Sequence, residues 1–378
     1  MDKHLFKTDA LTSSRLPLWA AMIFMVVMLA GLWQMASALR HADQLEFPSA
    51  WLDFKEGRMT TGLEKQLDQH LPARQDLIAI ANTLRYLLIG AGGEQVRVGS
   101  DGWLFLTEEL RFDSAADTNL TSRMSLLGNA SRNLAQMGVK LVIALVPDKA
   151  RVYAQQLPTG VYPDYNQARY QNALLGLKRE GVTVSDILTA MKPSALNTEV
   201  YYRSDTHWNQ RGAKCAAQAI AETLGQLQLT LEETRFSSSD NGAMVERSGD
   251  LLRLMGLEHV PNLLRPHPDT EIPVLTQQTS ADAVAGLFGD ASVPVVLTGT
   301  SYSLRGNFHG FLQQALSAKV LNAAKDGGGF LQSTTNYLTD QSFKTAPPKV
   351  IVWELPERFL TLPMTTEGLW LKASGLAH

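Results

Sequence analysis

The chain has 378 residues, of which 45% are hydrophobic and 19% are charged, and its formal net charge at pH 7 is −3. This length allows one large domain or two smaller ones with a substantial core, and the negative charge argues against electrostatic binding of nucleic acid. The single cysteine, Cys215, excludes an intrachain disulfide and a cysteine-rich zinc site.

The first long apolar run is LPLWAAMIFMVVMLAGLWQMASAL, residues 16–39, which no charge interrupts. Its length matches the ~20 apolar residues that span a bilayer. Basic residues precede it, so we expect residues 1–15 to stay cytoplasmic and the remaining chain to cross. A cleaved signal peptide is the alternative, because Ala36-Ser37-Ala38 has the pattern of a cleavage site. The run is longer than the ~7–15 residues of a usual signal core, which favours an uncleaved anchor.

A connector, residues 40–94, follows this run. Leucines recur in it at helical spacing, and Pro72 separates two predicted helices. The next stretch is VRVGSDGWLFL, residues 96–106, in which two apolar segments flank Gly-Ser-Asp-Gly. This arrangement predicts a small hairpin.

From about residue 119 short apolar strands alternate with helices. We predict strands at KLVIALVP, VTVS, VPVVLTG, KVLNAA and KVIVWELPE, which begin at residues 140, 182, 293, 319 and 349. Helices are expected near 120–137, 149–156 and 166–180, after Ser185 or Asp186, and over 210–227, with 230–280 as an irregular insertion. Apolar strands between helices indicate a mainly parallel sheet with helices on both faces. We therefore predict one α/β domain over residues 95–378.

Two polar motifs point to nucleophilic catalysis at this sheet. In YYRSDTHWNQRGA, residues 201–213, Asp205 and His207 lie two apart, and a carboxylate beside a histidine often orients a general base. In VPVVLTGTSYS, Ser301 follows a strand and Gly299, at the strand end where open α/β sheets hold ligands. Either motif alone is also typical of a polar turn or a helix cap. Together they supply the three residues of a Ser-His-Asp triad.

Six motifs between about residues 95 and 360 carry a family resemblance: GSDGWLF, LVPDKARVY, YYRSDTHWNQRGA, SGDL, TGTSYS and VIVWELPER. On these motifs the chain resembles the SGNH-hydrolase-like alginate O-acetyltransferases, the AlgJ and AlgX family, with relatives that acetylate cellulose and other exopolysaccharides. The resemblance places the nucleophile on Ser301 and the D-x-H motif on Asp205 and His207. Only about 20 residues follow WELPER, too few for the carbohydrate-binding module of AlgX, so we expect an architecture nearer to that of AlgJ.

The resemblance implies an SGNH-hydrolase-like (flavodoxin-like) three-layer fold, held in the periplasm by an inner-membrane anchor at residues 16–39. It implies acetyl transfer through an acetyl-serine onto an exopolysaccharide, with alginate first and cellulose next. The implied partners are that polymer, a membrane-bound O-acyltransferase that supplies acetyl groups, and other polysaccharide synthesis and export proteins. Neither a cofactor nor a metal is expected.

From their proximity to the motifs we predict six glycan contacts, which are Tyr302, Trp208, Arg305, Tyr153, Lys149 and Arg358. Core packing is the alternative for the aromatic members, since aromatic side chains are more often part of the core. The basic members suit either an anionic sugar or a structural ion pair. Glu354 follows an apolar strand and receives no role. Two other functions stay open: a carbohydrate acetylesterase with the same triad, and a non-catalytic scaffold of the export complex.

Overall fold

The computed structural model describes residues 22, 24–26, 28–33, 74–279 and 293–363. The chain divides into two compact units, residues 1–81 and residues 82–378. Most of the predicted anchor at 16–39 and most of the connector, with Pro72, lie outside the described residues, although residues 22, 24–26 and 28–33 are helical. In the described ranges no helix has both the length and the apolar character that crossing a bilayer requires. The anchor therefore stays a prediction.

A five-stranded parallel sheet in the order β10-β9-β11-β3-β4 forms the centre of the larger unit. Its strands are β3 (Lys140–Val146), β4 (Thr183–Asp186), β9 (Val295–Thr298), β10 (Val320–Asn322) and β11 (Val350–Pro356). The two longest strands, β3 and β11, pair along their whole length and are almost completely buried. Continuous apolar strands of this kind are stable where helices cover both faces of a sheet.

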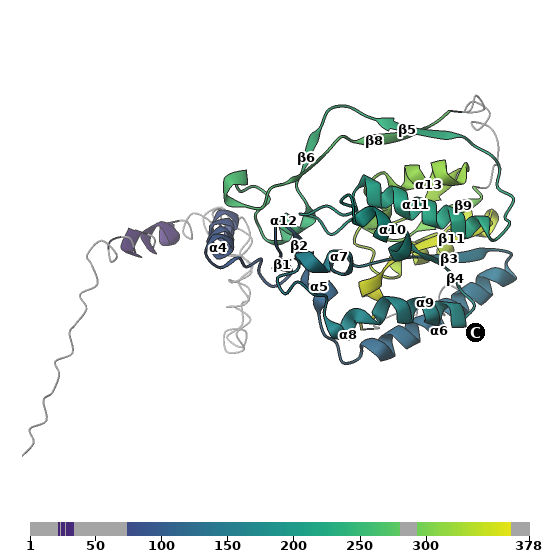
Figure 1. The fold of residues 1–378 in the computed structure, drawn as a ribbon, viewed down its shortest axis with the longest axis horizontal. Helices are drawn as coiled ribbons and strands as arrows, with labels where there is room; N and C mark the ends of the chain where they lie inside the picture. The colour runs from purple at the N-terminus through teal and green to yellow at the C-terminus, as the bar shows by residue number, and fades with distance from the viewer. Residues whose placement is uncertain (1–21, 23, 27, 34–73, 280–292, 364–378) are drawn as a thin grey trace, which may run out of the picture. The chain divides into compact units, whose positions relative to one another are not determined.

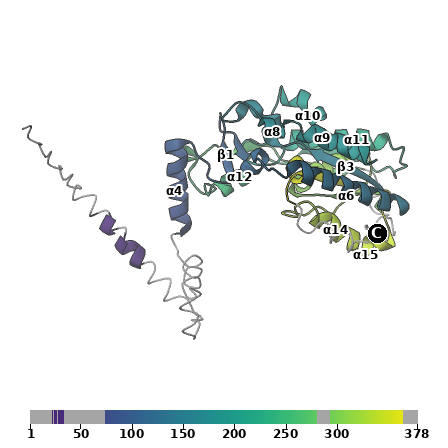
Figure 2. The same ribbon diagram turned by 90° about the horizontal axis from the view of Figure 1, so that it is seen from below.

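Helices cover the two faces of this sheet (Figures 1 and 2). On one face lie α10 (Ile187–Ala195), α11 (Gln210–Gly225) and α13 (Phe308–Leu316), and on the other lie α6 (Ala116–Gln136), α9 (Arg169–Arg179), α14 (Gln332–Thr339) and α15 (Gln341–Thr345). Successive side chains of β3 alternate between two cores, with Val142 in the core of α11 and Ile143 in the core of α6. The predicted three-layer α/β arrangement is confirmed.

Antiparallel pairs account for the other strands. The predicted hairpin is present as β1 (Val96–Val98) and β2 (Leu104–Leu106). The stretch 230–280, predicted to be irregular, contains two ribbons, β5 (Phe236–Asp240) with β8 (Val274–Gln278) and β6 (Val245–Arg247) with β7 (Asp269–Glu271). Local patterns missed these ribbons because each strand pairs with a distant partner. Ribbon β5–β8 lies along α13 (Figure 1).

One longer helix, α4, and several short elements make up the rest of the described structure. They are α4 (Arg74–Ile89), α5 (Thr107–Leu110), α7 (Lys149–Val152), η1 (Ala154–Gln156), α8 (Asp164–Gln167), α12 (Asp250–Leu254), η2 (Asn262–Leu264), η4 (Ser301–Leu304) and η5 (Glu357–Leu360). Elements α7, η4 and η5 directly follow strands β3, β9 and β11. Because these strands are parallel, the three turns gather at one edge of the sheet, where open α/β folds hold their ligands.

Candidate active site

The D-x-H motif lies in a turn just before α11. Tyr201 and Trp208 form an isolated bridge across this turn, and Asn209 caps the helix by accepting bonds from the backbone of Arg211 and Gly212. Within the turn, Asp205 Oδ1 accepts the backbone N–H of His207 at 2.9 Å and lies 2.5 Å from His207 Nδ1. The turn therefore presents the imidazole with its orientation set by the carboxylate.

Ser301 meets this imidazole from the other side. It begins η4, directly after β9 and the Gly299-Thr300 turn, and its Oγ lies 2.7 Å from His207 Nε2. A bond from Nδ1–H to Asp205 leaves Nε2 free to accept the Ser301 proton. The structure thus brings together the three residues predicted from two separate motifs.

Neighbouring groups stabilise the ionised form of Asp205. Burial alone would raise its pKa, but the hydrogen bond and the charge of His207, together with backbone N–H groups of His207 and Asp250, hold the pKa of Asp205 below its ordinary value. An ionised Asp205 is what orients the imidazole and stabilises it once it has taken a proton.

Glu354, which received no role from the sequence, supports the turn that carries Ser301. It is completely buried at the end of β11, and its carboxylate accepts the Thr300 N–H at 2.7 Å, the Thr300 hydroxyl at 3.0 Å and the Ser303 hydroxyl at 3.0 Å. These bonds hold the residues on both sides of Ser301. Gly299, with φ of 153°, packs against the same carboxylate, and a Cβ at residue 299 would lie 2.6 Å from Glu354 Oε2.

Two carboxylates from the 230–280 stretch fix the D-x-H turn. Asp250 accepts the backbone N–H of Thr206 at 2.8 Å and the Thr206 hydroxyl. Asp269 accepts the backbone N–H groups of Arg203 and Ser204 at 2.7 and 2.9 Å. Neither residue was predicted as a site residue, although Asp250 lies in the quoted SGDL motif. Their role depends on the folding of α12, which begins at Asp250, and of β7, which begins at Asp269, onto the turn.

Asp205, His207 and Asp250 offer ligand atoms within 4.8 Å of one another, a spacing that a metal ion could use. The hydrogen bonds of these residues favour a catalytic triad over a metal site. Nδ1 of His207 faces Asp205 and Nε2 faces Ser301, so both ring nitrogens are engaged. Asp250 is likewise committed to Thr206. The cluster therefore fits a hydrogen-bonded triad with a supporting carboxylate.

Lys149 holds the D-x-H turn through hydrogen bonds to its backbone and is not part of the described cavity lining. Its ammonium group donates to the backbone carbonyls of Arg203 and Asp205, both at 2.8 Å, and lies 5.2 Å from the centre of the Trp103 ring. Burial lowers the pKa of Lys149 to about 8, although the surrounding carboxylates oppose this shift.

Three predicted aromatic glycan contacts are also buried. Trp208 donates its ring N–H to the carbonyl of Tyr302, the Tyr302 hydroxyl donates to the carbonyl of Thr206, and the Tyr153 hydroxyl accepts the N–H of Val200. Their exposed fractions are 0%, 0% and 4%. Packing and backbone hydrogen bonds thus occupy the side chains of Trp208, Tyr302, Tyr153 and Lys149, and none of the four belongs to the described lining of the cavity around the triad.

Arg305 and Arg358, the other two predicted contacts, do line the cavity that contains the triad. This cavity has a volume of about 460 Å³, and its walls include Asp205, His207 and Ser301. Arg305 is half-exposed and pairs with Asp326 at 3.3 Å. Other parts of the wall come from η5, from α12, from Glu108 and from the glycine-rich segment 327–329.

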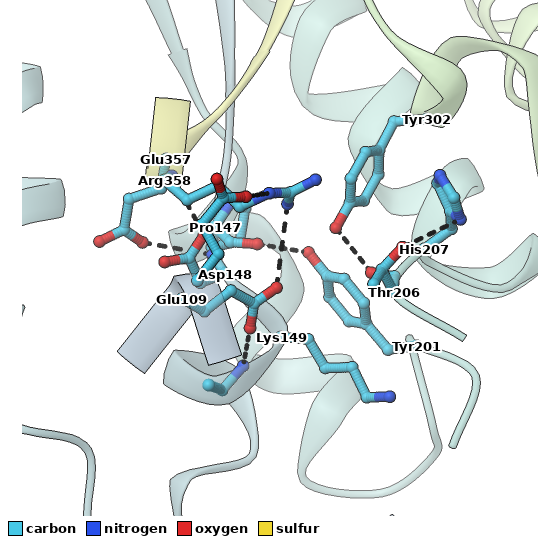
Figure 3. Close-up of polar contacts among 12 residues, drawn as sticks. Glu109, Pro147, Asp148, Lys149, Tyr201, Thr206, His207, Tyr302, Glu357 and Arg358 are labelled. Atoms are coloured by element: carbon cyan, nitrogen blue, oxygen red, sulfur yellow. Dashed lines mark hydrogen bonds and ion pairs between the residues drawn. The ribbon is translucent and has the colours of Figure 1, made fainter. Parts of the chain in front are cut away.

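A buried charged cluster holds Arg358 in the wall of this cavity. Figure 3 shows the Arg358 guanidinium between the Glu109 carboxylate and the Tyr302 ring, whose centre is 5.8 Å away. Arg358 lies 3.8 Å from Glu109 and 3.3 Å from Glu108. Burial raises the pKa of Glu109, and the charge of Arg358 opposes that shift. The carboxylates of Glu108 and Glu109 thus position the Arg358 guanidinium, and part of the Arg358 side chain lines the cavity.

The chain is similar to known proteins over most of this fold. A family model described as SGNH hydrolase-like domain, acetyltransferase AlgX, matches residues 96–357. The chain is 32% identical over 310 residues to the probable alginate O-acetylase AlgJ of Azotobacter vinelandii, with 81% of this chain and 80% of that protein covered. It is 33% identical over 337 residues to the probable alginate O-acetylase AlgJ of Pseudomonas aeruginosa, with 84% and 85% covered. The solved O-acetyltransferase domain of Pseudomonas putida AlgJ matches with a TM-score of 0.65 and 32% identity over 74% of this chain and 98% of that domain.

Proposed function

The chain belongs to the SGNH hydrolase-like acetyltransferases that the AlgX domain model describes, and on that premise we propose that it transfers acetyl groups to an exopolysaccharide through Ser301. Alginate is the first candidate for the polymer, because several relatives that are more than 30% identical are named alginate O-acetylases. The observation that carries the proposal is the position of Ser301 Oγ, 2.7 Å from a histidine that is oriented by a carboxylate at the edge of an open cavity.

In the first half of the reaction Ser301 takes the acetyl group. Its Oγ attacks the carbonyl carbon of an acetyl donor while His207 Nε2 accepts the hydroxyl proton. The bond from the carbonyl to the donor group then breaks, and the leaving group takes the proton from His207. Asp205 stabilises the charged imidazolium throughout. The product is an acetyl ester on Ser301 and the free donor group.

In the second half a sugar hydroxyl takes the acetyl group from Ser301. His207 accepts the proton of that hydroxyl as its oxygen attacks the ester carbonyl, and the bond to Ser301 Oγ breaks. The imidazolium then returns the proton to Ser301. Water competes with the sugar at ~55 M, so transfer requires a positioned acceptor. We expect weak hydrolysis of acetyl esters when no acceptor is bound.

The apolar run at residues 16–39 supports a place for this reaction outside the cytoplasm, with the catalytic domain anchored at the inner membrane. A membrane-bound acyltransferase that passes acetyl groups across the membrane then fits as the donor partner. The outward orientation can be tested by placing an exposed cysteine in the catalytic domain and labelling it in intact cells and in lysed cells. Labelling only after lysis would contradict the outward orientation.

Replacement of the nucleophile tests the reaction. Cells that carry Ser301→Ala are expected to produce polymer without acetyl groups, whereas the exposed serine variant Ser122→Ala should leave acetylation unchanged. With purified protein, acetyl on polymer and free acetate should be measured separately. Full acetylation with Ser301→Ala would refute the proposal, and free acetate as the sole product across several polymers would favour an esterase.

A further inference from the structure

A second cavity adjoins the triad cavity on the far side of Arg358. Its volume is about 290 Å³, and it is lined by residues 111–114, by Arg169 and by residues 361–363. Glu108 and Arg358 line both cavities, so these two side chains form the wall between them. An extended ligand that is bound at Ser301 can therefore continue past this wall into the second cavity.

The wall and the floor of the second cavity are built from paired charges. Arg358 is only 8% exposed and lies 3.3 Å from Glu108. Arg169, which is 6% exposed, pairs with Glu357 at 3.0 Å and with Asp148. Because these groups neutralise one another inside the protein, the cavity keeps its shape without a ligand.

The rim of the second cavity offers unused recognition groups. In the part of the chain that the structure describes, the guanidinium of Arg111 makes no ion pair or hydrogen bond. Next to it, Phe112 is 63% exposed although it is a large apolar side chain. Tyr165 meets the Phe112 ring edge-on, with 5.3 Å between ring centres, and donates its hydroxyl to the carbonyl of Leu110 at 2.6 Å. The Phe112 ring is thus braced in an exposed position.

We propose that this second cavity is a saccharide subsite, which binds a unit of the acceptor chain next to the unit that Ser301 acetylates. A pyranose ring would pack its apolar face on Phe112, as amphipathic ligands pack on exposed aromatic rings. Arg111 would pair with a carboxylate or hydroxyl of that sugar, so an acidic sugar fits best. The inference rests on the proposed transfer to a polysaccharide and extends it by naming the residues that bind the acceptor.

Such a subsite would help the enzyme to transfer the acetyl group to a sugar and not to water. A transferase that must favour a sugar hydroxyl over water gains by binding units of the acceptor that do not react, because that binding holds the reacting hydroxyl in place. A small ester that only acetylates Ser301 does not reach the second cavity. Hydrolysis of a small ester and transfer to a long acceptor therefore depend on different parts of the protein.

The test compares the purified full chain with Phe112→Ala and Arg111→Gln in two assays. The first measures hydrolysis of p-nitrophenyl acetate, and the second measures acetyl transfer from that ester to oligouronates of increasing length, with cello-oligosaccharides as the neutral counterpart. Leu196→Ala, which changes a side chain that is 86% exposed on the end of α10, is the matched control. We expect unchanged hydrolysis in all variants.

With longer oligouronates, Phe112→Ala should raise the acceptor KM by ~3- to 10-fold, the range of one aromatic contact. Arg111→Gln should show a similar rise that is absent with neutral oligomers. An unchanged KM for both variants would overturn the subsite, as would equal losses with short and long acceptors. A wild-type chain that neither binds nor acetylates any of these oligomers would also overturn it. If Ser301→Ala still hydrolyses the ester, the proposed function itself fails, whatever the subsite variants do.

Discussion

Glu354 provides the sharpest test of how the fold prepares Ser301 for reaction. Its buried carboxylate accepts hydrogen bonds from three donor groups of Thr300 and Ser303, and in the described residues no lysine or arginine pairs with it. Glu354→Leu would leave the Thr300 N–H without an acceptor, which costs about 1–3 kcal/mol, while the two hydroxyls can turn elsewhere. Loss of these bonds also frees the residues on both sides of Ser301. We expect kcat/KM for ester hydrolysis to fall by ~10- to 100-fold, since a shift of about 1 Å is enough for such a loss.

Glu354→Gln is the informative partner variant. Its carbonyl oxygen can replace Oε2, which accepts from Thr300 N and Ser303, and its NH2 group can donate to the Thr300 hydroxyl. The variant therefore keeps the geometry and removes the charge. We expect kcat/KM to fall by less than tenfold, because most of the positioning remains.

The stability of the wild-type protein should depend on pH in a defined direction because of Glu354. Burial raises the pKa of Glu354 above its ordinary value of 4.5, although the bonds from Thr300 and Ser303 oppose the shift. The folded protein therefore holds this proton more tightly than the unfolded chain, so the free energy of unfolding falls as pH rises from 4.5 through the raised pKa. Glu354→Gln lacks this dependence. Its stability relative to wild type should rise across that interval and then stay constant.

Initial rates of ester hydrolysis and urea unfolding, each measured from acidic to neutral pH, check these expectations. Asp186→Asn is the matched control, because Asp186 also ends a strand of the sheet but caps α10 outside the cavity. Wild-type kcat/KM in Glu354→Leu would refute the positioning role. A loss in Glu354→Gln as large as that in Glu354→Leu would show that charge, and not hydrogen bonding, is what matters.

Two further substitutions test the buried residues around the triad. Lys149→Met removes the donor to the carbonyls of the D-x-H turn, and we expect ester hydrolysis to fall by ~10-fold with little change in KM. Because burial lowers the pKa of Lys149 to about 8, wild-type stability should rise with pH between about 8 and 10.5, and a urea series on Lys149→Met that shows the same rise would contradict this assignment. Tyr302→Phe leaves the Thr206 carbonyl without its donor, so unfolding should become easier by about 1–3 kcal/mol. Calorimetry measures this loss, and a raised acceptor KM in Tyr302→Phe without loss of stability would restore the predicted sugar contact.

Local sequence patterns predicted much of this architecture. Apolar strands such as KLVIALVP and KVIVWELPE could only be stable in a sheet covered on both faces, and helical spacing over 210–227 predicted the helix observed at Gln210–Gly225. The motifs around Asp205, His207 and Ser301 also indicated the chemistry, because those residue types have few other uses in that combination. The anchor at 16–39 and the catalytic roles of the triad stay predictions.

The tertiary structure decided what those patterns could not. Ser301 and His207 are 94 residues apart in the chain, and only the folding of the whole domain brings the D-x-H turn against the turn that follows β9 and carries Ser301. The same folding places Asp250 beneath the D-x-H turn and buries Tyr302, which had been predicted to bind sugar. A residue type specifies the chemistry that a side chain can do. Whether it supports a neighbour, fills the core or faces the substrate depends on contacts with distant segments, which form only when the whole domain folds.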